Sequence, residues 1–213
     1  MEINNHGLIF YPVNNNSSVI KAMLSNRKWE KKIVNIFNEN ITKEDTVIDV
    51  GSYIGLHTIE LSKLAKKVFS FEPVPLISAC VEKTVKAMNI KNVIHKNVGC
   101  GADNRSDFIH TNYNGDSSMA GIRDHMFSQK FACEIVKLDD IINEPIKLMK
   151  IDVEGSEFNV LAGAIGIIEE YKPIIILETF KSKRNLKLLD EFCEGFDYDY
   201  EYISGDNYLL QPI

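Results

Sequence analysis

Residues Asp49–Gly55 read DVGSYIG and stand between two segments of opposite character. The apolar run before them, 46–50 (TVIDV), has the length and composition of a short buried strand. The segment after them, 56–67 (LHTIELSKLAKK), is helical in pattern. Glycines at such a junction allow a tight turn and a close approach of ligand to backbone. We therefore predict a strand, a ligand-binding loop and a helix, because ligands of open α/β sheets lie beyond the carboxyl ends of strands.

The same alternation of strand and helix continues along the chain. The predicted strands are too apolar for a sheet with one solvated face, which indicates a parallel sheet with helices on both faces. Segments 196–204 and 207–212 read as a hairpin around Gly205-Asp206 and would add an antiparallel edge. The remaining predicted strands are 68–73, 92–99, 131–138, 146–152 and 173–179, and the predicted helical segments are 75–89, 138–142, 156–171 and 182–194.

Two regions depart from this rhythm. Residues 1–16 are irregular and rich in Asn, and they look like an arm or a short strand. Residues 17–40 are helical in pattern, with Ser17 and Ser18 as plausible caps. Residues 102–130 are rich in Gly, Asp and Ser and suggest an ordered loop or a small hairpin, with a lid as one role. We expect a single domain, with residues 1–44 as an arm and helix packed on a core formed by 45–213.

The bulk composition limits the classes of partner. The chain has 213 residues, 45% of them hydrophobic, and a formal net charge of −6, which argues against a nucleic-acid or anionic-membrane partner. No apolar run approaches the roughly 20 residues that a membrane helix needs. The widely spaced Cys80, Cys100, Cys133 and Cys193 form no C-x-x-C pair. We expect a soluble, cytoplasmic protein with reduced and buried thiols.

The acids around the glycine loop indicate the ligand. The loop lacks the G-x-G-x-x-G pattern of dinucleotide sites, and a carboxylate at Asp49 would repel a pyrophosphate. It would suit an ammonium or sulfonium group. Glu72, at the end of the second strand, could accept two hydrogen bonds from a ribose diol. S-adenosylmethionine carries all of these groups and no phosphate, and it is the predicted cofactor.

The chain resembles the FkbM family of S-adenosylmethionine-dependent methyltransferases over roughly 45–178. The resemblance implies a class I, Rossmann-like fold with a seven-stranded sheet, and O-methylation, often of sugar or natural-product hydroxyls. The matching segments are VIDVGSYIGLHT at 47–58, FSFEP at 69–73, KNVGCGAD at 96–103, VKLDDII at 136–142, KIDVEGSEFNVLAGA at 150–164 and KPIIILE at 172–178.

Position in the predicted sheet and the resemblance together give a set of cofactor-binding residues. They lie in the glycine loop, in the helix after it and at the ends of the neighbouring strands. Asn97 is placed near the adenine by the resemblance. The set is Asp49, Gly51, Ser52, Tyr53, Gly55, Thr58, Glu72, Pro73, Asn97 and Asp152.

Methyl transfer to a hydroxyl calls for a group that removes the proton, or for a metal. Asp152 is the first catalytic candidate, because it should end the strand beside the glycine loop. Glu178 should lie one strand further along. The two carboxylates could hold Mg²⁺ with waters, or share a proton so that one pKa rises and a base results. Both alternatives stay open. His57 is a further catalytic candidate, with a capping or packing role as its alternative.

The other polar residues near these strand ends are assigned to substrate or to structure. Glu154 is a predicted substrate contact, because the adjacent Gly155 suggests a backbone shaped for a ligand. Glu157 reads as a helix-start charge. Ser117 and Ser118 are predicted to contact substrate or cofactor from the variable loop. Trp29 either joins the amino-terminal helix to the sheet or stacks on a sugar.

The predicted function is methyl transfer to a hydroxyl of a sugar, such as a deoxysugar like rhamnose, or of a related small molecule. One alternative is a methyltransferase that acts on a protein or amine. Another is a degenerate, non-catalytic module. The chain would also suit one domain of a larger glycan-modifying enzyme. The acceptor and the oligomeric state are not determined by the sequence.

Overall fold

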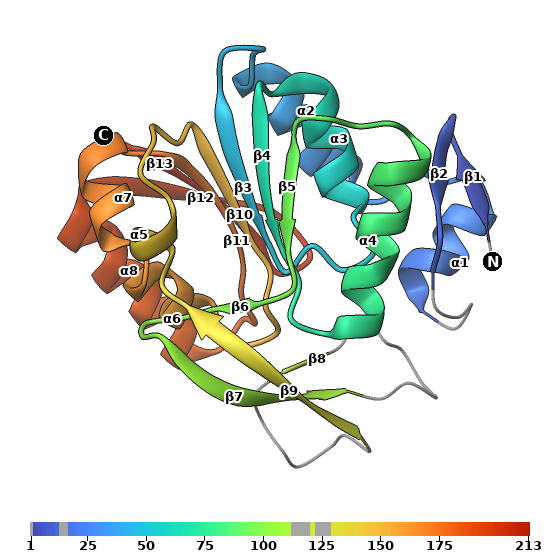
Figure 1. The fold of residues 1–213 in the computed structure, drawn as a ribbon. Coiled ribbons are helices and arrows are strands. Elements are labelled where there is room, and N and C mark those ends of the chain that lie inside the picture. The colour runs from blue at the N-terminus through green and yellow to red at the C-terminus, as the bar shows by residue number, and fades with distance from the viewer. Residues whose placement is uncertain (1, 13–16, 112–119, 122–128) are drawn as a thin grey trace.

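The computed structural model describes residues 2–12, 17–111, 120–121 and 129–213. Ser117 and Ser118, the predicted substrate contacts of the variable loop, lie outside the described residues. The central element is a seven-stranded sheet in the order β12-β13-β11-β10-β3-β4-β5 (Figure 1). Its strands are β3 (Thr46–Val50), β4 (Lys67–Phe71), β5 (Val93–Lys96), β10 (Leu148–Ile151), β11 (Ile174–Glu178), β12 (Tyr198–Ser204) and β13 (Asn207–Pro212).

The pairing of these strands confirms the predicted fold class. Adjacent strands run parallel from β11 through β10, β3 and β4 to β5, whereas β13 pairs antiparallel with both β11 and β12. The predicted carboxyl-terminal hairpin therefore forms and closes one edge of the parallel sheet. In register, Lys150 lies opposite Asp49 on one side and Ile176 on the other.

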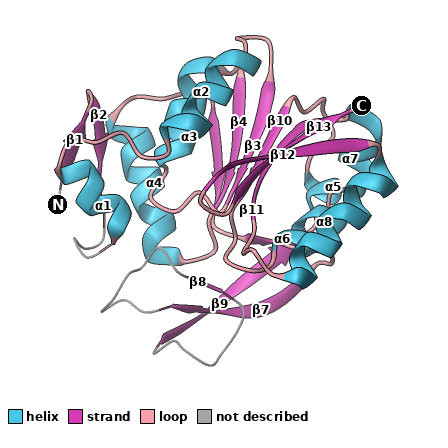
Figure 2. Ribbon diagram, turned by 180° about the vertical axis from the view of Figure 1, so that it is seen from behind, coloured by secondary structure: helices cyan, strands magenta, loops and turns pink. Residues whose placement is uncertain are grey.

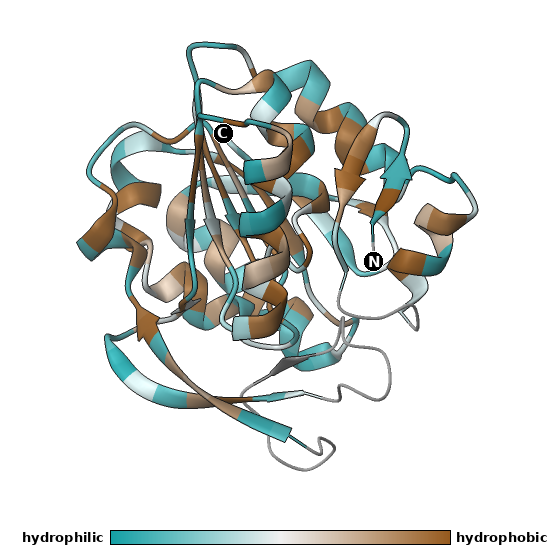
Figure 3. Cartoon of the chain, turned by 45° about the vertical axis from the view of Figure 1, so that its right-hand side comes forward, coloured by the Kyte–Doolittle hydropathy of each residue, from teal (hydrophilic) through white to brown (hydrophobic). Residues whose placement is uncertain are grey.

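Both faces of the sheet are buried, because alternate residues of each strand enter different apolar clusters. Ile48, Met149 and Ile175 belong to one cluster, with residues of helices α5 to α8. Val47, Leu148 and their equivalents face the other side, where α2 and α3 pack. Figure 3 shows the resulting apolar strands at the centre and the hydrophilic outer faces of the helices.

Helices cover both faces of the sheet, as Figure 2 shows from behind. The region 17–40 forms two helices, and the chain between them passes through positive φ at Asn26 and Glu30. The segment 156–171 also divides, at Gly163, where a Cβ would lie 1.9 Å from the carbonyl oxygen of Gly101. The helices are α1 (Ser18–Leu24), α2 (Lys31–Asn40), α3 (Leu56–Leu64), α4 (Pro75–Ala87), α5 (Leu138–Ile141), α6 (Glu157–Ala162), α7 (Ile165–Tyr171) and α8 (Lys183–Phe196).

A second sheet lies below the carboxyl ends of the central strands in Figure 1, in the order β6-β9-β7-β8. Its longest ladder joins β7 (Arg105–Thr111) to β9 (Gln129–Val136), and the short strands are β6 (Gly99–Cys100) and β8 (Ala120–Gly121). The predicted loop or small hairpin at 102–130 thus contains a full strand, and the predicted strand 131–138 pairs with it outside the central sheet. The β7–β9 ribbon packs on the core through Ile109 and Ile135, which belong to a buried apolar cluster.

The amino-terminal residues pack on the core as a small layer of their own. Strands β1 (Ile3–Asn5) and β2 (Leu8–Phe10) pair antiparallel, where the sequence suggested an arm or a short strand. Ser17 caps α1 by accepting a hydrogen bond from the backbone N–H of Ile20 at 3.1 Å, as predicted. The predicted division at 44–45 stays a prediction.

All four cysteines are buried free thiols, which confirms their predicted state. In the parts of the chain that the structure describes, no helix is long and apolar enough to cross a bilayer.

Candidate active site

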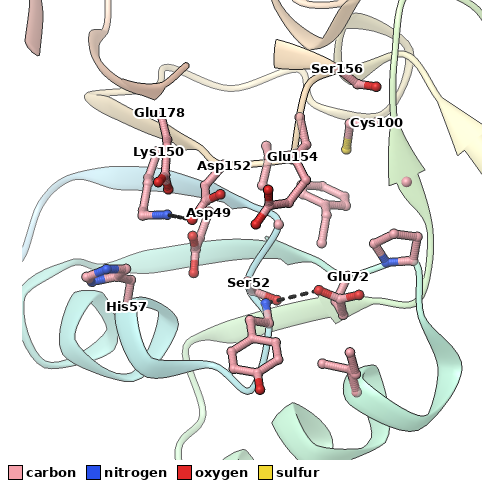
Figure 4. A pocket seen from close by; sticks show the side chains of 18 of the residues that line it. Asp49, Ser52, His57, Glu72, Cys100, Lys150, Asp152, Glu154, Ser156 and Glu178 are labelled. Carbon is pink, nitrogen blue, oxygen red and sulfur yellow. Dashed lines mark hydrogen bonds and ion pairs between the residues drawn. The ribbon is translucent and has the colours of Figure 1, made fainter. Parts of the chain in front are cut away.

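A cavity of about 260 Å³ opens where the central strands end (Figure 4). Its wall combines the glycine loop, the ends of β10 and β11, and apolar residues of the β7–β9 ribbon such as Ile109 and Ile135. Trp29 and Glu30, from the segment between α1 and α2, complete the wall. The cavity therefore lies at the ligand site expected for a parallel sheet.

Gly51 brings the glycine loop against the end of β10. Its φ is +79°, and a Cβ at this position would lie 1.7 Å from the carbonyl oxygen of Asp152. The backbone N–H groups of Gly51 and Ser52 both donate to the carbonyl of Phe71 at 3.0 Å. Asp152 in turn donates its N–H to Val50 at 3.0 Å. The loop is thus fixed between two strands, and only glycine fits at its first position.

Asp49 is fully buried at the end of β3, and only one of its carboxylate oxygens is hydrogen-bonded. Thr58 donates its hydroxyl to Oδ2 at 2.5 Å, whereas Oδ1 has no partner among the described residues. The Ser52 hydroxyl, also buried and on the cavity wall, likewise has none there. A buried carboxylate oxygen without a donor is costly. Asp49 therefore suits a ligand with a cationic or N–H donor group.

Glu72 lies across the glycine loop from Asp49, as Figure 4 shows. Its carboxylate accepts the backbone N–H of Tyr53 at 3.0 Å and that of Val74 at 2.9 Å. Burial raises the pKa of this carboxyl to about 8, although both hydrogen bonds oppose the shift. Each oxygen keeps a further lone pair. Asn97 supports the strand end from behind by donating to the carbonyls of Glu72 and Pro73 at 2.7 and 3.0 Å.

Four ionisable side chains gather on the other side of the loop because they share one face of the sheet. Side chains two residues apart on a strand point to the same face of a sheet. On β3, β10 and β11, the residues two or four positions before these side chains face α2 and α3. The same face therefore carries Asp49, Lys150, Asp152 and Glu178. Lys150, 2% exposed, donates to Oδ2 of Asp152 at 3.0 Å (Figure 4). Burial alone would lower the pKa of this lysine, but Asp152 and the other carboxylates raise it above its ordinary value. The lysine is therefore a buried ammonium group.

The pKa of Glu178 is raised in the same surroundings, but here burial acts in the same direction as the neighbouring carboxylate. Burial and the neighbouring Asp152 raise its pKa to about 9, against the opposing effect of Lys150. At neutral pH Glu178 therefore holds its proton, as expected for a buried carboxyl group that lies beside a second one. This placement of Asp152 and Glu178 on adjacent strand ends matches the sequence-based prediction.

Lys150 is the functional group that the sequence analysis missed. The signal was present, since Lys150 precedes Asp152 by two residues and a strand of period two puts both on one face. A lysine in an apolar strand was read there as part of the strand and not as part of the site. Across the described residues, no cluster of three or more His, Cys, Asp or Glu side chains is placed to hold a metal.

The loop after β10 is shaped by Glu157. Glu154 and Gly155 have φ values of +54° and +102°, and Glu157 accepts the N–H of Gly155 at 2.7 Å. Glu157 is buried at the first residue of α6, and burial raises its pKa. The predicted helix-start position of Glu157 is therefore correct, and its carboxylate holds the turn. Glu154, the predicted substrate contact, lies on the cavity wall.

His57 and Glu30 form a pair that links the amino-terminal segment to the core. Nε2 of His57 lies 2.7 Å from Oε2 of Glu30, and Asn207 donates to Oε1 at 3.1 Å. Burial opposes ionisation of Glu30, but the His57 hydrogen bond and the charge of Lys150 lower its pKa to about 2. His57 also packs edge-on against Phe37. His57 thus has a clear structural role beside its predicted catalytic one.

The predicted site residues divide into a wall and a layer behind it. Gly55, Thr58 and Asn97 do not line the cavity: Gly55 is the N-cap of α3 with φ +88°, Thr58 donates to Asp49, and Asn97 donates to the carbonyl of Glu72. Their predicted cofactor contacts stay predictions. The predicted residues on the wall are Asp49, Gly51, Ser52, Tyr53, His57, Glu72, Pro73, Asp152, Glu154 and Glu178.

Solved structures show that this fold is shared with methyltransferases. FkbM methyltransferase from Methylobacillus flagellatus has a TM-score of 0.61 at 16% identity, with 91% of this chain covering 52% of that one. SMU.1697c from Streptococcus mutans, solved with SAH, has a TM-score of 0.57 at 15% identity, with coverages of 86% and 96%. An rRNA methylase from Streptococcus thermophilus has a TM-score of 0.54 at 16% identity, with coverages of 85% and 94%.

The family assignment comes from the sequence model. The chain spans about half the length of the M. flagellatus protein. No curated protein sequence matches it. The family model of the methyltransferase FkbM domain matches residues 49–202. This range includes the glycine loop and the ends of β10 and β11, where Asp152 and Glu178 lie. The chain therefore belongs to the FkbM family of S-adenosylmethionine-dependent methyltransferases.

Proposed function

We propose that this domain transfers a methyl group from S-adenosylmethionine to a hydroxyl of a sugar or a related small molecule. The observation that carries the proposal is the carboxylate of Asp152, which lies on the cavity wall next to the glycine loop and is held by the ammonium of Lys150. A positioned carboxylate is the base that a hydroxyl nucleophile needs.

The two sides of the glycine loop would hold the two ends of the cofactor. Glu72 would accept hydrogen bonds from the ribose hydroxyls through its remaining lone pairs. The backbone of the glycine loop would pack against the cofactor. The unpartnered Oδ1 of Asp49 would accept the ammonium of the methionine group. When bound, the cofactor supplies an electrophilic methyl group on a cationic sulfur.

The acidic strand ends would handle the proton. Asp152 would accept the acceptor's hydroxyl proton as its oxygen attacks the methyl carbon. Lys150 would orient Asp152 through its hydrogen bond, while Glu178 stays protonated beside it. The ammonium of Lys150 donates to Asp152 and interacts electrostatically with Glu178, the two carboxylates that the magnesium alternative would use. We therefore favour a base mechanism over a metal-dependent one.

The test is a methyl-transfer assay with a panel of monosaccharides and oligosaccharides, deoxysugars first. The variant Asp152→Asn should bind S-adenosylmethionine like the wild type and lose methyl transfer by roughly 10²–10⁴-fold. Asp199→Asn, at an exposed position of β12, is the matched control. Full turnover by Asp152→Asn would remove the base assignment. Loss of wild-type turnover on EDTA treatment, restored by Mg²⁺, would instead support the metal alternative.

A further inference from the structure

We infer that Trp29 and Glu30 form the acceptor subsite and select an uncharged ligand with neighbouring hydroxyl groups. This inference rests on the proposed methyl transfer. Both residues line the cavity and lie outside the matched family region 49–202. The glycine loop and strand ends would bind the cofactor and carry the proton. The segment between α1 and α2 forms the wall left for the acceptor.

Glu30 is held rigidly in a conformation that a glutamate rarely adopts. Its backbone is left-handed, with φ 43° and ψ 51°. Such a conformation is unfavourable for a non-glycine residue and is kept when the surroundings enforce it. Here the carboxylate is tied to His57 on α3 and to Asn207 on β13. The segment is thus fixed with this carboxylate on the cavity wall.

The surroundings of Glu30 place it on the acceptor side of the cavity. Asn207, which donates to Glu30, lies opposite Glu178 in the β11–β13 ladder, so Glu30 lies at the end of the cavity where Glu178 and Asp152 lie. Glu30 is ionised and accepts hydrogen bonds only. One lone pair on each oxygen remains after the bonds to His57 and Asn207. A ligand hydroxyl at this end could donate to Glu30 while a second hydroxyl faces Asp152.

The charge of the cavity wall selects against anionic acceptors. The described wall residues include six carboxyl side chains, those of Glu30, Asp49, Glu72, Asp152, Glu154 and Glu178. Their only lysine or arginine is Lys150, which is already paired with Asp152. A phosphate or a nucleic-acid backbone would meet like charge here. A protonated amine would fit the charge, but it has no lone pair with which to attack a methyl group. Hydroxyl donors fit both requirements.

Trp29 supplies the apolar half of the subsite. It is half-buried, lines the cavity and packs against the apolar cluster that contains Val19 and Ile20. The indole ring offers a large apolar surface against which the C–H groups of a ligand can pack. The neighbouring carboxylate can accept hydrogen bonds from hydroxyl groups at the edge of the same ligand. Trp29 is also the only tryptophan of the chain, so its fluorescence reports on this wall alone.

The experiment is a fluorescence titration of the full chain, excited where only tryptophan absorbs, with and without saturating SAH. The neutral probes are rhamnose, fucose, glucose and N-acetylglucosamine. Glucose 6-phosphate and glucosamine test anionic and cationic ligands. We expect at least one neutral sugar to change Trp29 emission saturably, and the phosphate to have no effect. The variant Glu30→Gln should lower the affinity for that sugar by about tenfold, the loss expected for a hydrogen bond to a charged group. Its affinity for SAH should stay within about twofold of the wild-type value.

Controls keep the two proposals separate. If Glu30→Gln does not fold, Trp29→Leu is tested by saturation-transfer NMR, where the sugar signal should fall by a similar factor. The inference is overturned if no neutral sugar perturbs Trp29, if only the phosphate or the amine binds, or if the variant that folds binds the sugar unchanged. Those results with normal SAH binding leave the proposed function standing. Absence of SAH binding would instead refute the proposed function, and the sugar titration without SAH still decides the subsite.

Discussion

Gly51 shows how one residue without a side chain determines the site. The loop must approach β10 so closely that a Cβ would overlap the carbonyl oxygen of Asp152 at 1.7 Å. We expect Gly51→Ala to lower the free energy of unfolding by several kcal/mol, because overpacking of a fixed backbone adds to the strain of positive φ. Urea unfolding followed by circular dichroism measures this change.

Gly7 provides the control for backbone strain alone. Its φ is +82°, close to that of Gly51, but nothing lies within 4 Å of a Cβ placed there. Gly7→Ala should therefore cost only about 1 kcal/mol. Equal losses in the two variants would show that the approach of the loop to β10 is not tight.

Glu72 gives the site a pH dependence. Burial raises its pKa to about 8, so the free protein holds this carboxyl proton at neutral pH. The ionised carboxylate accepts hydrogen bonds from two ribose hydroxyls more strongly than the protonated form, whose O–H group is itself a donor. Affinity for S-adenosylmethionine should therefore rise as pH increases toward about 8 and level off above it, by at most about tenfold per pH unit.

Calorimetry across this range measures the dependence on Glu72. The variant Glu72→Gln removes the titration and should bind weakly with a flatter profile. The comparison separates Glu72 from groups of the ligand that titrate in the same range. The same steep profile in both proteins would show that Glu72 does not control binding.

At the level of single residues, the sequence identified the carboxylates but not their counter-charge. Asp49, Glu72 and Asp152 follow apolar strands, and that position alone places them at the edge where ligands bind. The pairing of Lys150 with Asp152 depends on which face of β10 is lined by neighbouring acids. That face follows from strand order, which the sequence suggests only indirectly. The contribution of Glu30 depends on packing between segments far apart in the chain.

Strand β10 is the element on which the charges meet. Lys150→Met would leave the buried Asp49 and the partly exposed Asp152 without their cation. Removing one partner of a buried ion pair typically costs 3–5 kcal/mol, so we expect a loss of this size in the free energy of unfolding. The variant should also lose methyl transfer, because Asp152 is no longer oriented.

Lys63→Met on α3 is the control for the removal of a lysine. Lys63 is 45% exposed and pairs with Glu60 at 2.8 Å, and exposed pairs contribute at most about 1 kcal/mol. Comparable stability of the two variants in urea would contradict the account of Lys150 as a buried cation.

Among the elements, the central strands were the most predictable from sequence. Short apolar runs next to glycine or proline have few alternatives in an α/β chain. The β7–β9 ribbon was harder to predict, because its outer face is polar and the strand at 105–111 looks like loop sequence. The breaks in the helical segments also escaped prediction, since Gly163 is needed for the approach of Gly101 from a distant part of the chain.

At the scale of the whole molecule, the cavity lies between layers that come from all parts of the chain. The core contributes the glycine loop and the acidic strand ends, the ribbon contributes Ile109 and Ile135, and the amino-terminal segment contributes Trp29 and Glu30. The family resemblance covers the first of these and much of the second. The amino-terminal wall was not predictable, because its contacts with α3 and β13 arise only when the layers assemble.

The central claim is that Asp49 and Glu72, on either side of one glycine loop, bind S-adenosylmethionine. Isothermal titration calorimetry of the wild type and of Asp49→Asn tests it most directly, with Asp199→Asn as the matched exposed control. We predict micromolar binding by the wild type and the control, and at least about tenfold weaker binding by Asp49→Asn, the loss expected for a charge-assisted hydrogen bond. No binding by the wild type, or unchanged binding by Asp49→Asn, would contradict the account.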